Sequence, residues 1–486
     1  MNTSEIKHIS DFSDKLNPML VKELRQGLRR SGFVILFISL QAILAFILLF
    51  TAGFASSENA GHLLSRTFFF LFSCAALIVQ PLRGISALSS EIKADTIDLL
   101  CLTRLSTWRI AFGKWISLVG QSALILTAVI PYLIFRYFFG DMQIFSEIML
   151  LFSIFIASAT LTACTVGLSS TKSAIIRVLL PLGGSMFTFI IISRTFASSR
   201  YLYQDTLQLF DFVTGTSQLN YIAFLVVCLY IGWMCLDFAC SQVAPIAESR
   251  STLKRTMSFV MIALALITMT LAEMDFSAVI LLSTLLCLPI SVISLTEKPQ
   301  LVPPIVKPFV KKGILGKIAG RFLYPGWATG LLYTLLLFTL LIFALLLGMS
   351  SYLDLANYTI DEWAKITTLA LFASLFFPIA MTGIFARKRD NRFGLFMLFS
   401  CIQLFIICSC YACEQLTDDL ELMPYFCWIP LTLPILESDA HFSSPTLNTI
   451  AWLNVGVYFL IALTTTSAVW KHIRSTEAQL QPSTES

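Results

Sequence analysis

The chain has 486 residues, of which 57% are hydrophobic and 13% charged, and its mean hydropathy is +0.80. This composition excludes a soluble globular domain and indicates a protein that lies almost entirely in a membrane. The formal charge of +4 does not indicate nucleic-acid binding. We assign this charge to residues next to the membrane spans, which face anionic lipid headgroups.

An amphipathic helix is predicted before the first long apolar run. Asn17 and Pro18 suit the N-cap and the first position of a helix. The following residues would place Leu20, Val21, Leu24 and Leu28 on one side and Lys22, Glu23, Arg25, Gln26, Arg29 and Arg30 on the other. We therefore expect residues 1–31 to form a cytoplasmic lead with an interfacial helix whose basic face meets the headgroups. The alternative is an ordinary basic flank of a signal anchor.

About twelve apolar runs follow, each close to the roughly 20 residues that cross a bilayer as a helix. They are Gly32–Phe54, Thr67–Leu82, Trp115–Phe138, Ile148–Leu168, Val178–Ser193, Asn220–Cys240, Met257–Leu271, Phe276–Leu295, Trp327–Met349, Ile366–Phe385, Phe393–Cys413 and Asn448–Trp470. Two of these runs are short, so a slightly lower count stays open. The predicted fold class is an all-α, polytopic helical membrane protein, because helices satisfy their own backbone in lipid. No cleavable signal peptide is evident, since the first run is longer than a signal core.

The positive charges predict the orientation of these spans. With the N-terminus in the cytoplasm, the outer segments hold only Arg66, Arg136, Arg194, Arg200 and Lys365 of the 33 Lys and Arg. Cytoplasmic segments are enriched in Lys and Arg in membrane proteins. We therefore expect both termini in the cytoplasm.

Two cytoplasmic segments are long enough to hold structure. Within 83–114, the stretch Glu91–Lys114 is too polar to span a bilayer and too apolar for a simple loop. It predicts a short helical element at the membrane surface on which another protein acts, with Leu105, Trp108 and Phe112 in one apolar stripe. The second segment, 296–326, is rich in Pro and Lys and indicates a linker with a basic membrane-surface stretch.

Two outer loops also predict structure. In 194–219, Tyr203, Leu207 and Phe210 have helical spacing, so we expect a short helix that dips into the outer interface. In 414–447 three prolines, at 424, 430 and 434, exclude a regular spanning helix. A re-entrant or interfacial piece is expected there. A disulfide between Cys413 and Cys427 is an open alternative in an oxidising outer compartment.

The order of these features suggests two six-helix halves, although the sequence shows no clear repeat. We divide the chain into the lead, a six-helix core at 32–256, a hairpin at 257–295, the basic linker, and a four-helix region at 327–486. Whether residues 257–486 are a degenerate second half stays open.

Catalytic chemistry is not expected, because polar groups at mid-depth are scarce and no metal-binding cluster of His and carboxylates is present. The pairs Gly113-Lys114 and Gly316-Lys317 lack the flanking residues of a phosphate-binding loop. We therefore expect no enzyme, metal or cofactor in this chain. Residues that could line a substrate pathway are Gln80, Pro81, Pro181, Gly183 and Gly184, and the alternative for each is packing alone.

Two stretches resemble the membrane subunits of ABC exporters of the ABC-two type. At 17–30, NPMLVKELRQGLRR carries the family's pattern at Asn17, Pro18, Lys22, Glu23, Leu24 and Arg25. The second stretch matches at Glu91, Thr96, Asp98, Leu99, Leu100, Thr103, Leu105, Ser106, Gly113 and Lys114. Asp95 stands where Gly is usual and Arg104 where Pro is usual. The resemblance covers roughly residues 17–256.

The resemblance implies a permease that exports an unidentified substrate, with ATP and Mg bound by a separate ATPase subunit. The cytoplasmic surface elements would couple to that ATPase through Glu91, Thr96, Asp98, Leu99, Leu100, Arg104, Leu105, Trp108, Arg109 and Lys114. One pseudo-twofold chain or a homodimer would then form the membrane part. A bacterial inner membrane is the expected setting. The alternatives are a secondary carrier without an ATPase and a non-transporting membrane scaffold.

Overall fold

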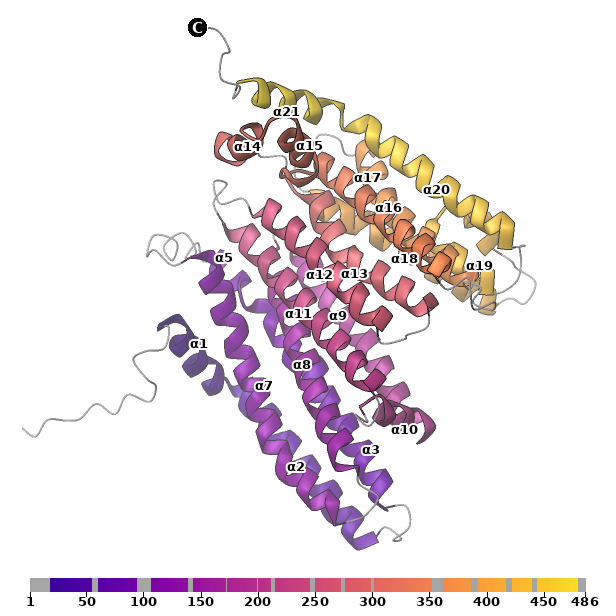
Figure 1. The fold of residues 1–486 in the computed structure, drawn as a ribbon. Helices are drawn as coiled ribbons and strands as arrows, with labels where there is room; N and C mark the ends of the chain where they lie inside the picture. The colour runs from indigo at the N-terminus through magenta and orange to yellow at the C-terminus, as the bar shows by residue number, and fades with distance from the viewer. Residues whose placement is uncertain are drawn as a thin grey trace, which may run out of the picture. The chain divides into compact units, whose positions relative to one another are not determined.

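The computed structural model describes residues 18–54, 60–93, 106–138, 143–171, 173–198, 200–210, 215–244, 250–271, 276–298, 301–351, 362–385, 392–416, 422–438 and 444–479. The chain divides into two compact units, Met1–Val243 and Ala244–Ser486 (Figure 1). The division lies ahead of the boundary after residue 256 that the sequence suggested. The reason is that the helix predicted from Met257 begins at Ser251 and packs with the second unit.

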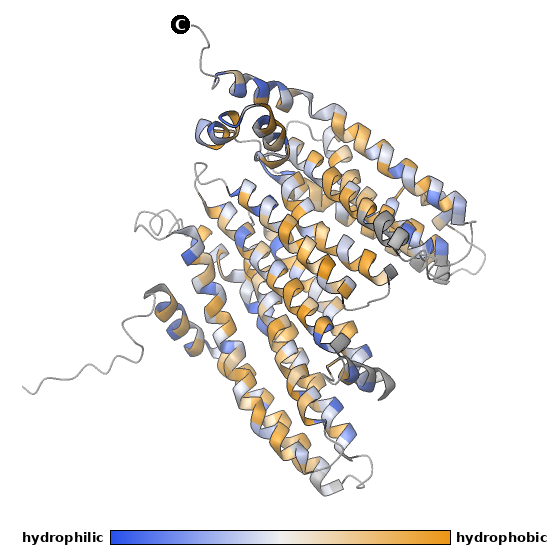
Figure 2. Cartoon of the chain, in the orientation of Figure 1, coloured by the Kyte–Doolittle hydropathy of each residue, from blue (hydrophilic) through white to orange (hydrophobic). Residues whose placement is uncertain are grey.

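The predicted all-α polytopic fold is confirmed. Every regular element in the described residues is a helix. Eleven of these helices are long and apolar enough to cross a membrane, and a bent pair makes a twelfth if it is counted as one span. Figure 2 shows hydrophobic residues along most of the length of the long helices. This distribution is the one expected of helices that face lipid or each other.

The described residues of the first unit contain six candidate spans and an amphipathic helix near the N-terminus. Its elements are α1 (Pro18–Arg29), α2 (Ser31–Phe54), α3 (Ala60–Ser73), η1 (Cys74–Val79), α4 (Gln80–Leu82), η2 (Arg83–Ser86), α5 (Ser89–Lys93), α7 (Thr107–Tyr137), α8 (Ile144–Ser169), α9 (Ala174–Ile192), η3 (Ser193–Ser198), α10 (Arg200–Leu209) and α11 (Gly215–Val243). The second span is irregular, because a π-helical turn, η1, precedes Pro81.

Helix α8 lies in the interior of the first unit, packed against α7, α11 and the irregular second span. Small residues permit these close approaches. A Cβ at Gly84 would contact the hydroxyl of Thr165, and a Cβ at Gly167 would lie 2.7 Å from the carbonyl oxygen of Cys235. Side chains also link the spans, since Trp115 Nε1 donates to the carbonyl of Ala159 at 2.8 Å.

The outer helix predicted within 194–219 is present as α10, but it is buried in the protein. Tyr203 and Leu207 belong to the hydrophobic core of the unit. The hydroxyls of Tyr203 and Ser65 lie 2.6 Å apart, and the Tyr203 ring packs against Phe69 and Phe196. The expected dip into the outer membrane interface stays a prediction, and the Tyr203 ring finds its partners on α3 and η3.

The second unit is built around α17, the most buried of its spans. Its elements are α12 (Ser251–Leu271), α13 (Phe276–Thr296), α14 (Pro303–Val310), α15 (Gly313–Leu323), α16 (Trp327–Ser351), α17 (Glu362–Phe385), α18 (Arg392–Leu416), η5 (Met423–Phe426), η6 (Pro430–Thr432), α19 (Leu433–Ser438), α20 (Ser444–Thr465) and α21 (Ser467–Gln479). The described part of the proline-rich outer segment, 422–438, forms the short helices η5, η6 and α19 and no regular spanning helix, as expected. Cys413 and Cys427 are not joined in the structure, so the alternative disulfide is not formed there.

The linker predicted at 296–326 forms a sharp bend. Helices α15 and α16 meet at 94°, so α15 lies across the direction of the span that follows it. Glycines permit the compact corner: a Cβ at Gly316 would contact the carbonyl of Phe309, and one at Gly320 would contact the ring of Tyr324. Gly326 at the corner has a φ of 133°, a value that favours glycine.

A buried ion cluster stabilises this corner. Glu297, directly after α13, lies 2.9 Å from both Lys254 Nζ and Arg255 Nη2. Arg255 also donates to the carbonyls of Phe322 at 2.6 Å and Gly326 at 3.2 Å. Burial alone raises the pKa of Glu297, but the charges of Lys254 and Arg255 outweigh it and lower that pKa to about 2.

The two units have the same order of elements. Each has six spans in its described residues if α15 and α16 count as one. Each also has its long expected cytoplasmic segment between the second and third spans, and short helices between the fifth and sixth. The most extensive helix pairing in each unit joins its fourth and sixth spans, α8 with α11 and α17 with α20. A shared topology explains the parallel that the sequence pattern suggested without a visible repeat.

The close approach of α8 to α11 gives a first prediction. Gly167→Ala places a methyl group against the backbone of Cys235, so we expect a loss of about 1–3 kcal/mol and a lower thermal unfolding midpoint in mild detergent. Gly183→Ala is the matched control, because its Cβ would meet open space on α9. Equal midpoints for the two variants would contradict this packing.

The ion cluster gives a second prediction. Glu297→Gln leaves Lys254 and Arg255 without their carboxylate, so we expect a loss of about 3 kcal/mol at neutral pH. The pKa of Glu297 is lower in the folded protein than its ordinary 4.5, so its contribution is complete above pH 4.5 and is lost as the pH falls toward 2. Thermal midpoints of both proteins should thus differ by a constant amount from pH 6 to 8 and converge below pH 4.5. A gap that widened on acidification would contradict the assignment.

Candidate functional site

The candidate site lies where α1 packs on α7, on the expected cytoplasmic side of the first unit. Figure 1 shows α1 beside the first half of α7. The two helices approach closely at their glycines. A Cβ at Gly27 would contact the amide of Gln121, and a Cβ at Gly120 would lie 3.2 Å from Leu24. This packing places Glu23 of α1 beside the ends of the second and third spans.

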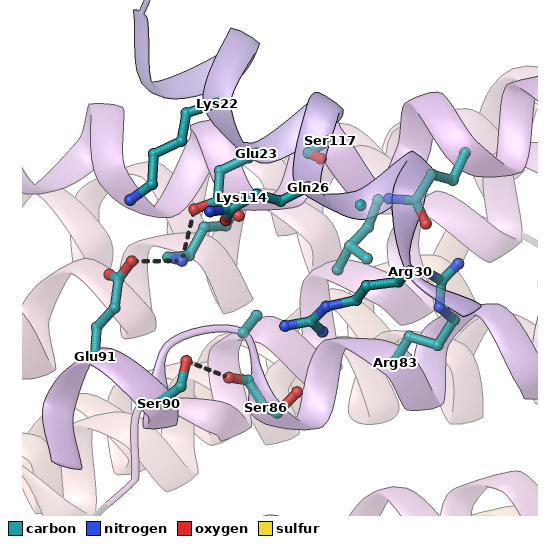
Figure 3. Close-up of a pocket in the computed structure, with 14 residues that line it drawn as sticks. Lys22, Glu23, Gln26, Arg30, Arg83, Ser86, Ser90, Glu91, Lys114 and Ser117 are labelled. Carbon is teal, nitrogen blue, oxygen red and sulfur yellow. Dashed lines mark hydrogen bonds and ion pairs between the residues drawn. The ribbon is translucent and has the colours of Figure 1, made fainter. Parts of the chain in front are cut away.

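Three charged side chains from separate segments meet there (Figure 3). Lys114 Nζ on α7 lies 3.1 Å from a carboxylate oxygen of Glu23 on α1 and 2.8 Å from one of Glu91 on α5. The Lys114 side chain is only 6% exposed, and the two carboxylates are 18% and 15% exposed. A buried ammonium group is costly unless it is paired. We call Glu23, Lys114 and Glu91 the ion triad.

The predicted amphipathic helix is present as α1, and one of its polar residues lies differently from the prediction. Lys22, Arg25 and Arg29 are exposed on α1. Glu23 was expected on the same polar face toward the headgroups, but its carboxylate is turned toward α7 because Lys114 offers a buried charge there. Asn17 lies outside the described residues, and α1 begins at Pro18.

The predicted surface element between Glu91 and Lys114 is divided in the structure. Helix α5 ends at Lys93 and α7 begins at Thr107, so Trp108, Arg109 and Lys114 belong to the first turns of a spanning helix. A separate surface helix is therefore wrong for 107–114. The expected coupling residues Thr96, Asp98, Leu99, Leu100, Arg104 and Leu105 lie outside the described residues.

The first turns of α7 present different residues to the core and to the surface. Ile110 and Ala111 are buried in a small core with Leu88. Arg109 is exposed, and Phe112 is exposed while its ring stacks on Trp108 at a centroid distance of 6.2 Å. Arg109 and Phe112 are thus accessible to a partner next to residues 94–105.

The five expected pathway residues have different surroundings within the first unit. Gln80 and Pro81 are buried, and both ends of the Gln80 amide are paired: Nε2 donates to the carbonyl of Leu118 at 3.1 Å, and Oε1 accepts from Arg83 at 3.0 Å. Pro181 is buried, whereas Gly183 and Gly184 have open space beside them. These surroundings give Gln80 and Pro81 a packing role within the unit.

From the sequence we did not predict that charged residues at the ends of the spans pair with one another. Lys254, Arg255 and Glu297 were treated as flank and linker residues, but they form the ion cluster that stabilises the corner before α16. Gln121 was not singled out, although it is completely buried at the α1 contact. A polar residue placed just inside the end of an apolar run was the available signal, since such a group must find partners.

Comparison with protein-family models, with curated proteins and with solved structures found no match to this chain.

The ion triad predicts how much each of three substitutions lowers the stability of the folded protein. Lys114→Met removes both ion pairs and leaves two carboxylates facing each other, so we expect a loss of about 3 kcal/mol. Glu23→Gln and Glu91→Gln each leave one pair intact, and each should cost about 1 kcal/mol. The thermal unfolding midpoints of the three variants in mild detergent would test this order of stability.

The matched control for these variants is Lys22→Met, which removes an exposed lysine from the same helix. We expect it to leave the midpoint nearly unchanged. A midpoint for Lys114→Met as high as that of Lys22→Met would show that the triad contributes nothing to stability.

Proposed function

We propose that this chain is the membrane permease subunit of an ATP-driven exporter and that a separate ATPase supplies the energy. The observation that supports this proposal best is the ion triad. Its three members come from the two stretches that resemble ABC-two exporters, and Lys114 connects them within 3.1 Å. Residues distant in sequence thus meet at one place on the expected cytoplasmic side.

The triad offers a mechanical route into the membrane. Glu91 and Lys114 flank residues 94–105 on either side, and their ion pair joins α5 to α7. Helix α7 continues from Thr107 to Tyr137 without interruption. A partner that displaces residues 94–105 would therefore move the ends of the second and third spans together, and Glu23 would carry the motion to α1.

The repeated order of elements supports a single chain that supplies both halves of the membrane part. In this proposal α14 and α15 occupy, in the second unit, the sequence position that residues 94–105 occupy in the first. One permease chain would then bind two ATPase subunits. A homodimer would instead bring four six-span units together.

A secondary carrier is the second candidate, and one observation favours it. Asp237 is completely buried within the span α11. Buried carboxylates inside spans are typical of proton-coupled transport pathways. The carrier candidate predicts transport that depends on Asp237 and needs no ATPase.

Co-purification tests the exporter proposal. The tagged protein, extracted from its native membrane in mild detergent, should retain a partner with a phosphate-binding loop. Native mass spectrometry should give one permease chain per two such partners. Replacing residues 94–105 by a neutral Gly-Ser linker should reduce the bound partner at least tenfold, because this segment would be its main contact.

The matched control replaces the outer segment 352–361 by a similar linker and should leave binding unchanged. A folded protein that retains no ATPase in any of these preparations would contradict the exporter proposal. Transport in that preparation, abolished by Asp237→Asn, would establish the carrier instead.

A further inference from the structure

A small polar cavity lies beside the ion triad and has no role in the proposed coupling. Its volume is about 130 Å³, and it is bounded by α1, by the η2–α5 region and by α7. Figure 3 shows the ion triad at one end of this cavity and Arg30 and Arg83 at the other. Ser86, Ser90, Ser117 and Gln121 complete the polar lining.

The arginine end of the cavity carries uncompensated positive charge. Within the described part of the chain, neither Arg30 nor Arg83 forms an ion pair with a carboxylate, and their two charges repel each other. At the opposite end, Lys114 already has two carboxylates. The field across the cavity therefore favours an anion at the arginine end.

Two contacts hold Arg83 in place. Its Nη1 donates to Gln80 Oε1 at 3.0 Å, and its guanidinium carbon lies 5.2 Å from the centre of the Phe33 ring. Among the described residues these contacts use one face and one nitrogen, which leaves other N–H groups of the guanidinium for an oxyanion. A fixed guanidinium loses little freedom when it binds an oxyanion, because its donors already have their geometry.

Gln121 provides an independent sign of a ligand. Its side chain is completely buried and lines the cavity, yet neither its amide nitrogen nor its amide oxygen has a hydrogen-bond partner among the residues that the structure describes. Buried polar groups are nearly always paired. An oxygen of a bound group could accept a hydrogen bond from the Gln121 nitrogen.

We propose that Arg30, Arg83 and Gln121 form a binding site for a phosphate group, carried either by the headgroup of an anionic phospholipid or by free phosphate. Guanidinium groups bind phosphate oxygens through paired hydrogen bonds. The cavity is much smaller than the roughly 300 Å³ or more of a drug-sized pocket, so a headgroup phosphate suits it better than a transported substrate. The inference does not depend on the proposed transport function.

The location of the site indicates what phosphate binding would do to the protein. Arg30 lies between the end of α1 and the start of α2, and Arg83 follows the buried Gln80–Pro81 turn of the second span. A phosphate between them would connect α1 to the second span at the end of the cavity away from the ion triad. Binding would therefore stabilise the docked position of α1.

Lipid titration tests the site on the full-length protein in mild detergent. Native mass spectrometry would count bound dioleoyl phosphatidylglycerol and dioleoyl phosphatidylcholine, and the thermal midpoint would be followed in parallel. We expect one saturable phosphatidylglycerol that raises the midpoint. Arg30→Gln and Arg83→Gln should each weaken its binding about tenfold, the size expected for a hydrogen bond to a charged group.

Arg29→Gln is the matched control, because it removes the same charge from the neighbouring residue, the last of α1, which does not line the cavity. Its binding of phosphatidylglycerol should equal that of the unchanged protein. Because Arg83→Gln could also disturb the Phe33 contact, Arg30→Gln gives the test that does not depend on folding of the second span.

Inorganic phosphate distinguishes the two sources. If it raises the midpoint and displaces phosphatidylglycerol in an Arg30-dependent manner, the site binds phosphate from solution. If only the lipid binds, the source is the membrane. Equal binding of the two lipids, or equal weakening by Arg29→Gln and Arg30→Gln, would overturn the proposal, because either result would mean general attraction to a basic surface.

Discussion

A lysine buried at the end of a membrane span has to be paired, and Lys114 imposes that requirement on the first unit. Its two carboxylate partners come from α1 and α5, which are distant in sequence, and they lie within 3.1 Å of its ammonium nitrogen. The cost of an unpaired buried charge thus determines where α1 docks and which way Glu23 turns. The polar cavity beside α1 exists because this docking brings Arg30 close to Arg83.

The second unit also pairs its buried charges, with different residues. Lys254 and Arg255 begin the first span of that unit, and Glu297 follows its second span. Arg255 then donates to the backbone at Phe322 and Gly326, which fixes the corner between α15 and α16. In each unit a buried ion cluster therefore connects the spans to the segment between the second and third of them.

Small residues permit the closest helix contacts inside both units. Lipid is as apolar as a leucine side chain, so burying such a residue between helices gives little driving force in a membrane. The helices instead make close backbone contacts, such as those of Gly167 with Cys235 and of Gly330 with Ser294. Few residues of α2 and α9 are buried, and both helices are strongly apolar. Such surfaces are expected where a helix contacts lipid or another subunit.

The sequence alone determined the membrane class, the number and positions of the spans, the helix from Pro18 and the irregular proline-rich outer segment. These features follow from local rules: apolar length, helical periodicity and the lost N–H of proline. The tertiary structure decided that Glu23 faces inward, that Tyr203 is buried, that residues 107–114 continue into α7, and that Gln121, Arg30 and Arg83 share a cavity. Each of these depends on a partner from another segment, and the position of that partner is fixed only when the helices pack.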